Sequence, residues 1–178
     1  MKVFYQEIRK QIEDNTSVQH VRLWNNQINL SEKGEQIPFQ FPAVFIDFPY
    51  MQWSQVGKGV QTCQLTIRLY IVFESFITAE NEEDVEIFDL RDEVYLAVTD
   101  PAFVPTNAKM LMRISEQTDP NHTNTYVWTM DFNTTFTETI GITPRGNVSA
   151  EINTLNLDTD LIIDPNTVDG VRTDKDFE

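Results

Sequence analysis

The clearest pattern in the chain runs from Val60 to Phe73, where apolar residues alternate with mostly polar ones. Alternation with a period of two is typical of a β-strand with one buried face. The segment Tyr50–Val56 alternates more weakly, and Gly57-Lys58-Gly59 separates it from the long run. The sequence therefore predicts a β-hairpin that turns at the glycines and whose far end projects from the body. The positions predicted to face the core are Cys63, Leu65, Ile67, Leu69, Ile71 and Phe73.

Further patterns predict the remaining strands. Strands are expected at Val18–Trp24, at Ala43–Phe48, at Lys109–Ser115 and at Thr125–Glu138. The last two are predicted to pair as a hairpin, because Asp119-Pro120-Asn121 between them is typical of a turn. In the first strand Val21 and Leu23 are expected on one face, opposite His20 and Arg22. Residues 25–37 are polar and predict a loop or a hairpin tip.

Two segments change to the helical period. In residues 2–14, Phe4, Ile8 and Ile12 recur every four residues, which predicts a short amphipathic helix. Residues 80–98 begin with acidic side chains, which suit a helix N-terminus, and end before Asp100-Pro101. Their apolar stripe consists of Ile87, Leu90, Val94, Ala97 and Val98. The predicted fold class is α+β: a mostly antiparallel β-sheet with two helices packed on one face, plus a C-terminal acidic extension.

The character of the chain changes near Gly146. Beyond it aromatic residues are absent until Phe177, and eight acidic residues face two basic ones. We therefore expect one α+β domain at residues 1–146 and an acidic C-terminal arm at residues 147–178. A short apolar segment in the arm, Leu155–Ile163, is a candidate edge strand for this body or for a neighbour.

Charge and cysteine content narrow the function classes. The 178 residues carry 28 acidic and 13 basic side chains, a formal charge of −15, which opposes ordinary binding to nucleic-acid phosphates. Cys63 is the single cysteine, so one chain can form neither an internal disulfide nor a thiolate metal cluster. Neither a signal peptide nor a membrane-spanning segment is predicted, and we expect no membrane partner.

The residues that catalysis requires are scarce. His20 and His122 are the two histidines, one in a predicted strand and one in a turn, where solvated side chains are common. Cys63 lies on a predicted core face, where a thiol acts as a small hydrophobic group. Gly57-Lys58-Gly59 lacks the strand-to-helix context of a phosphate-binding loop. We therefore predict no catalytic, cofactor or metal site and no enzymatic activity, although the many acidic pairs leave a hydrolase open.

Several aromatic residues lie outside the predicted buried faces, and they are the candidates for contacts between subunits. Aromatic side chains are enriched at interface hot spots, but core packing explains them equally well, and both readings stay open here. The projecting hairpin adds an apolar and a basic residue to the set. The candidate interface residues are Trp24, Tyr50, Trp53, Val56, Lys58 and Phe103.

Three passages carry a resemblance to a known family. They are Phe41-Pro42-Ala43-Val44-Phe45-Ile46, then Gly57-Lys58-Gly59 leading into Gln64–Ile71, and the helix ending Val94-Tyr95-Leu96-Ala97-Val98. Together with the order of elements, they make residues 2–140 similar to bacteriophage tail terminator (tail completion) proteins. The acidic arm and the long polar segment 25–37 depart from that pattern.

The resemblance implies a structural role in a virion. Tail terminators form a ring of six subunits that caps the tail tube, ends its polymerisation and joins it to the head connector. The implied partners are further copies of the chain, a tail tube protein and a head-tail connector protein, with DNA passing through the lumen without sequence-specific binding. The implied place is the tail or neck of a virion assembled in the host cytoplasm. The alternatives are another connector component (stopper or adaptor), a tail tube protein, or a non-viral α+β binding module.

Overall fold

A computed structural model describes residues 1–32, 39–74, 86–122 and 125–139. Within these ranges the chain forms three helices and five strands, and the strands make one sheet in the order β1-β2-β3-β5-β4. β1 is parallel to β2, and the other neighbours are antiparallel. The elements are α1 (Lys2–Asn15), β1 (His20–Leu23), α2 (Gln27–Glu32), β2 (Ala43–Gly57), β3 (Val60–Glu74), α3 (Glu86–Thr99), β4 (Met112–Asp119) and β5 (Thr125–Glu138). The predicted α+β class and mostly antiparallel sheet are confirmed.

β3 is the central strand. It pairs with β2 on one side and with β5 on the other, from Gln61 opposite Glu138 to Glu74 opposite Thr125. All six apolar residues predicted to face the core are buried. The hairpin turns at Lys58-Gly59, where Gly59 has φ 79°, a left-handed conformation that favours glycine. The predicted hairpin and its long strand with one buried face are confirmed, and its central position in the sheet is a finding of the structure.

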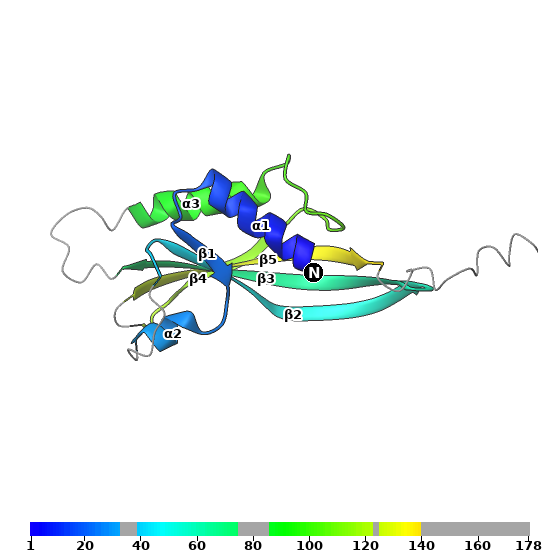
Figure 1. The fold of residues 1–178 in the computed structure, drawn as a ribbon, viewed down its shortest axis with the longest axis horizontal. Coiled ribbons are helices and arrows are strands. Elements are labelled where there is room, and N and C mark those ends of the chain that lie inside the picture. Colours follow the sequence, from blue (N-terminus) through cyan, green and yellow to red (C-terminus); the bar gives the residue numbers. More distant parts are fainter. Residues whose placement is uncertain (33–38, 75–85, 123–124, 140–178) are drawn as a thin grey trace, which may run out of the picture. The chain divides into compact units, whose positions relative to one another are not determined.

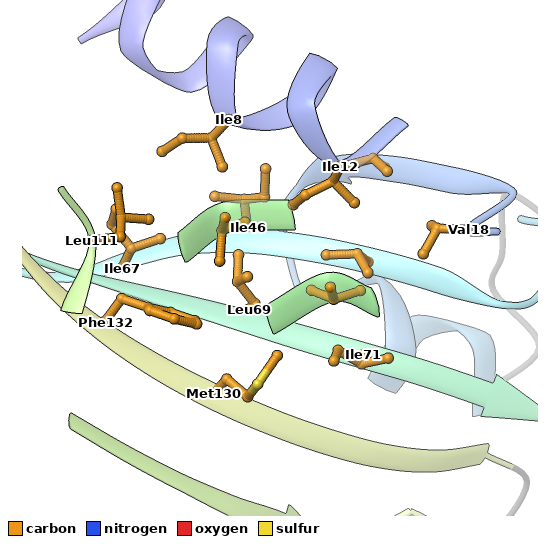
Figure 2. Close-up of a cluster of buried hydrophobic side chains, with 14 of the residues drawn as sticks. Ile8, Ile12, Val18, Ile46, Ile67, Leu69, Ile71, Leu111, Met130 and Phe132 are labelled. Atoms are coloured by element: carbon orange, nitrogen blue, oxygen red, sulfur yellow. The ribbon is translucent and has the colours of Figure 1, made fainter. Parts of the chain in front are cut away.

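Both long helices cover the same face of the sheet. Figure 1 shows α1 and α3 on one side of the strands, and their buried residues belong to one cluster with those of β2, β3 and β5. In Figure 2, Ile8 and Ile12 of α1 point toward Ile46, Ile67 and Leu69 of the sheet. The Gln11 side-chain amide also donates to the carbonyl oxygen of Ala97 at 2.9 Å, which joins the two helices. The predicted pair of helices on one face is confirmed.

The other face carries a smaller core that the sequence did not predict. Residues 25–37 were expected to form a loop, but α2 lies within them, on the side of the sheet opposite α1 and α3 (Figure 1). Its Ile28 is fully buried against Ala43, Phe45, Val72 and Val127. The two apolar residues of α2, Ile28 and Leu30, lie two positions apart and give no helical period, so burial by the sheet decides the conformation of this segment.

Several predicted bounds move. β1 is shorter than Val18–Trp24, and Leu23 is 49% exposed instead of sharing the buried face with Val21. β4 covers Met112–Asp119 instead of Lys109–Ser115, because the chain before it follows β5 through irregular hydrogen bonds. α3 begins at Glu86, while residues 80–85 lie outside the described residues. The domain boundary at 146, the arm at 147–178 and Leu155–Ile163 also lie outside them.

Docking of α1 should be a large source of stability. Replacing the fully buried Ile8 with alanine removes apolar contacts on both the helix and the sheet side, and we expect it to lower the free energy of unfolding by about 2–5 kcal/mol. Val3→Ala in the same helix, at a position 54% exposed, is the control and should cost less than about 1 kcal/mol. Urea unfolding followed by circular dichroism measures both, and equal losses would contradict the assigned packing.

Candidate interaction surface

The outer half of the β2–β3 hairpin projects from the body. Figure 1 shows both strands continuing past the N-terminal end of α1. β1 covers the outer edge of β2 only from Ala43 to Ile46, with a last hydrogen bond from the Trp24 amide to the Ile46 carbonyl at 2.8 Å. From Asp47 to Gly57, no strand of the described chain pairs with that edge. This part of β2 therefore has unpaired main-chain groups available to another strand.

A bulge sets the direction of the side chains in this half. The pairing with β3 shifts between Asp47 and Tyr50, where Pro49 cannot donate a main-chain hydrogen bond. We call the side of the sheet covered by α1 and α3 the helix face, and the opposite side the open face. After the shift Tyr50 lies opposite Thr66 on the open face, while Trp53 lies opposite Cys63 on the helix face. Tyr50 and Trp53, three residues apart, point to opposite faces of the strand, and the bulge before them decides that Trp53 takes the helix face.

Four of the six predicted interface residues are brought together here. The exposed fractions are 54% for Tyr50, 38% for Trp53 and 66% for Val56, and Lys58 is exposed at the turn. Met51, which was not predicted, adds a further apolar side chain at 46%. Trp53 leans on Phe136 edge to face, with ring centroids 6.4 Å apart, so its indole is partly held by the body.

The other two predicted residues pack inside the body. Trp24 stacks on Tyr70 with ring centroids 4.4 Å apart and meets Phe45 edge to face at 5.9 Å. Phe103 is partly buried against the main core. For these two residues the structure favours core packing, the second reading that the sequence left open.

The projecting half differs from the rest of the chain in charge. Between Phe48 and Ile67, Lys58 is the single charged residue, whereas the whole chain has 41 charged residues in 178. Exposed edge strands are commonly protected from pairing by charged side chains. Beyond Pro49 the outer half of β2 carries none, so its sequence leaves it open to a partner strand.

A second exposed apolar surface lies near β4. We call it the methionine surface; it consists of Met110, Met112 and Ile114, which are 43%, 67% and 52% exposed. It adjoins a hollow of about 450 Å³ whose walls also include Gln64 and Thr134. The three residues alternate along the chain, as expected of the predicted strand Lys109–Ser115, but Leu111 between Met110 and Met112 takes the buried position, at 3% exposed. Alternation alone does not say which of two apolar faces meets the core.

Polar side chains tie the strands together across the open face. Arg68 of β3 binds Asp131 of β5 through two hydrogen bonds, at 2.7 and 2.8 Å, and Ser115 of β4 donates to the same carboxylate at 3.2 Å. The hydrogen bonds from Arg68 lower the pKa of Asp131. In return Asp131 raises the pKa of Arg68. This pair holds three strands in register where neither helix layer covers them.

Burial shifts the pKa of two potentially reactive side chains in the described part of the chain. Cys63 is buried and its thiol pKa is raised by that burial, which opposes a reactive thiolate. Burial likewise lowers the pKa of His20. In the described part of the chain, no three His, Cys, Asp or Glu side chains group closely enough to hold a metal ion. Within the same ranges, no helix has the length and apolar content needed to cross a membrane.

Comparisons with known proteins include a distant likeness in fold. No protein-family model matches the chain, and no curated protein matches it. Among solved structures, the chain is similar to one described as the virion of a native gene transfer agent particle, with a TM-score of 0.44 and 8% identity over 76% of this chain and 92% of that chain. A likeness at this level does not establish a shared function.

The Arg68–Asp131 pair should make stability depend on pH. Its contribution is present above the ordinary pKa of an aspartate, near 3.8, and is lost as the pH falls through the lowered pKa of Asp131. We expect Asp131→Asn to cost about 1–3 kcal/mol at pH 7 and progressively less below pH ~3.8. Urea unfolding across this range measures the difference. Asp92→Asn on the exposed face of α3 is the control, and a pH-independent cost for Asp131→Asn would refute the assignment.

Proposed function

We propose that this protein is a structural subunit of a phage-type virion, in which six copies form a ring that caps the tail tube, ends its polymerisation and joins it to the head connector. The observation that carries the proposal is the outer half of β2, an exposed edge strand that carries no charge beyond Pro49 in a chain of net charge −15. The resemblance of residues 2–140 to tail terminators supplies the biological setting. In this proposal the protein has no catalytic step, cofactor or metal.

An edge strand without a neighbour allows one copy of a protein to bind another. Its unpaired main-chain groups can extend a sheet into a neighbouring chain, and its exposed apolar side chains gain free energy when that neighbour covers them. A contact between two different surfaces of identical copies is heterologous, and repeated around an axis it closes a ring. The projecting hairpin provides one such surface, away from the helices.

The overall charge suits a ring through which DNA passes. A chain with 28 acidic and 13 basic residues has little to neutralise phosphates with, so DNA would cross its lumen without being held. The same negative charge argues against a protein that binds DNA sequence-specifically. In this proposal the ring therefore works by binding the end of the tail tube on one side and the head connector on the other.

The rival functions differ in how far assembly proceeds. A stopper or adaptor would form a ring but would not bind the end of a tail tube, whereas a tail tube protein would continue into rods. A non-viral binding module would remain a monomer or dimer. No described feature favours one of these rivals over the capping ring.

The mass in solution tests the ring. We expect light scattering over a concentration series to show a species of about six subunits, or a rise toward one, because each copy offers complementary surfaces to two neighbours. Negative-stain electron microscopy of the same sample should show rings and no rods. Rods would assign the chain to the tube, and a strict monomer at all concentrations would contradict self-assembly.

A charge placed on the hairpin edge should prevent assembly. We expect Val56→Lys to raise the concentration at which the ring forms by at least about tenfold, because closing the contact would bury an unpaired ammonium group at a cost above about 1.4 kcal/mol. Leu96→Lys is the matched control: Leu96 is 64% exposed on α3, and the change alters net charge equally. Light scattering of both variants decides, and equal effects would count against the hairpin as the contact.

A further inference from the structure

We propose that the outer half of β2 in one copy pairs with β4 of the next copy, with its tip against the methionine surface. This contact rests on the proposed ring and specifies the receiving surface within it. β4 ends the sheet opposite to β1 and β2, so its outer edge has no strand neighbour in the described chain. Among the described residues, the sheet thus has one open edge at either side.

Strand directions favour this pairing. Three successive antiparallel pairings connect β2 to β3, β3 to β5 and β5 to β4. β4 therefore runs opposite to β2. A second copy placed beside β4 in the same orientation, as its neighbour in a ring, offers its β2 to β4 in antiparallel direction. The sheet can then continue from copy to copy without turning either subunit over.

The free lengths of the two edges also match. β4 has eight residues, Met112–Asp119, and the segment of β2 after the bulge, Tyr50–Gly57, also has eight. Within one copy Met112 lies at the level of Tyr50, since both are connected through Thr66 and Asn133. If Tyr50–Gly57 of the next copy lies opposite Met112–Asp119, the next copy is displaced by about seven residues, roughly 24 Å, along the strands. This displacement places β1 of the next copy beyond the end of β4, where it does not obstruct the pairing. Sheets that close on themselves require a stagger of this kind.

The charged side chains of β4 are compatible with an uncharged neighbouring strand. Arg113 pairs with Glu116 at 3.0 Å and lies over the Tyr95 ring at 4.1 Å, and Glu116 also accepts from Arg91. Asp119 bonds to the Asn121 amide at 3.0 Å. An uncharged strand laid along this edge therefore covers charges that already have partners within the chain, which avoids the main cost of burying them.

The apolar side chains meet in the same arrangement. With the segments opposed, the hairpin tip lies at the Met112 end of β4, so Val56 comes next to Met112 and near Met110. The hollow of about 450 Å³ beside these methionines has room for a branched aliphatic side chain, and methionine adapts its shape to such a neighbour. Two exposed apolar surfaces are thus covered by a single contact.

Cysteine cross-linking between copies tests the contact. Val56→Cys and Met112→Cys are made in separate chains, mixed, allowed to assemble and oxidised. Side chains of neighbouring strands lie within disulfide range, so the mixture should yield at least about tenfold more disulfide-linked dimer than either variant alone, because the paired thiols have a high effective concentration. The native chain, whose Cys63 is fully buried, and a mixture of Val56→Cys with Leu96→Cys are the controls.

The other outcomes separate this contact from the proposed function. Ring mass without a cross-link in the mixture would overturn the β4 contact and leave the ring intact. Equal dimer from Val56→Cys alone would indicate two β2 edges related by a twofold axis, which also overturns it. Equal cross-linking to Leu96→Cys would show unspecific collision. A chain that stays monomeric would refute both the contact and the ring.

Discussion

The double pairing of β3 is the constraint on which the rest of this structure depends. Because β3 is hydrogen-bonded to β2 and β5 along nearly its whole length, its alternating residues decide which face of both neighbours is apolar. A slip of one residue would exchange the two faces of the sheet. α1 and α3 can dock only where the apolar face lies, and Arg68 and Asp131 can meet only on the other. The long alternating run therefore also determines where the two helices dock and where the Arg68–Asp131 pair forms.

Strong periodic patterns were enough to predict the frame of the fold. The buried positions of β3, the hairpin turn at Lys58-Gly59, both long helices and β5 follow from local spacing. α2 was missed because its apolar residues, Ile28 and Leu30, lie two positions apart and give no helical period. The sheet face that buries Ile28 is not revealed by any local pattern. Met110, Leu111 and Met112 are all apolar, so local spacing does not say which of them faces the core, and in the structure it is Leu111.

The candidate interface was predictable in part. Tyr50, Trp53 and Val56 could be assigned to a projecting hairpin because the glycine turn and the long strand locate them. Trp24 and Phe103 could not be separated from them, since an aromatic residue outside a clean alternation is either exposed or packed by an element elsewhere in the sequence. Exposure of an edge depends on where the neighbouring strand stops. Here β1 ends opposite Ile46, and the short sequence of β1 does not predict this end point.

Net charge and local neutrality act on different length scales in this chain. Copies carrying −15 each repel one another over roughly a Debye length, about 10 Å at 0.1 M salt, whereas main-chain pairing acts at contact. In the proposed ring, the repulsion slows random encounters, and the part of β2 beyond Pro49, which carries no charge, leaves a place where two copies can approach. Counterions that screen the repulsion would therefore act as a control on nucleation, so the ionic strength of the surroundings would govern how soon the first contact forms.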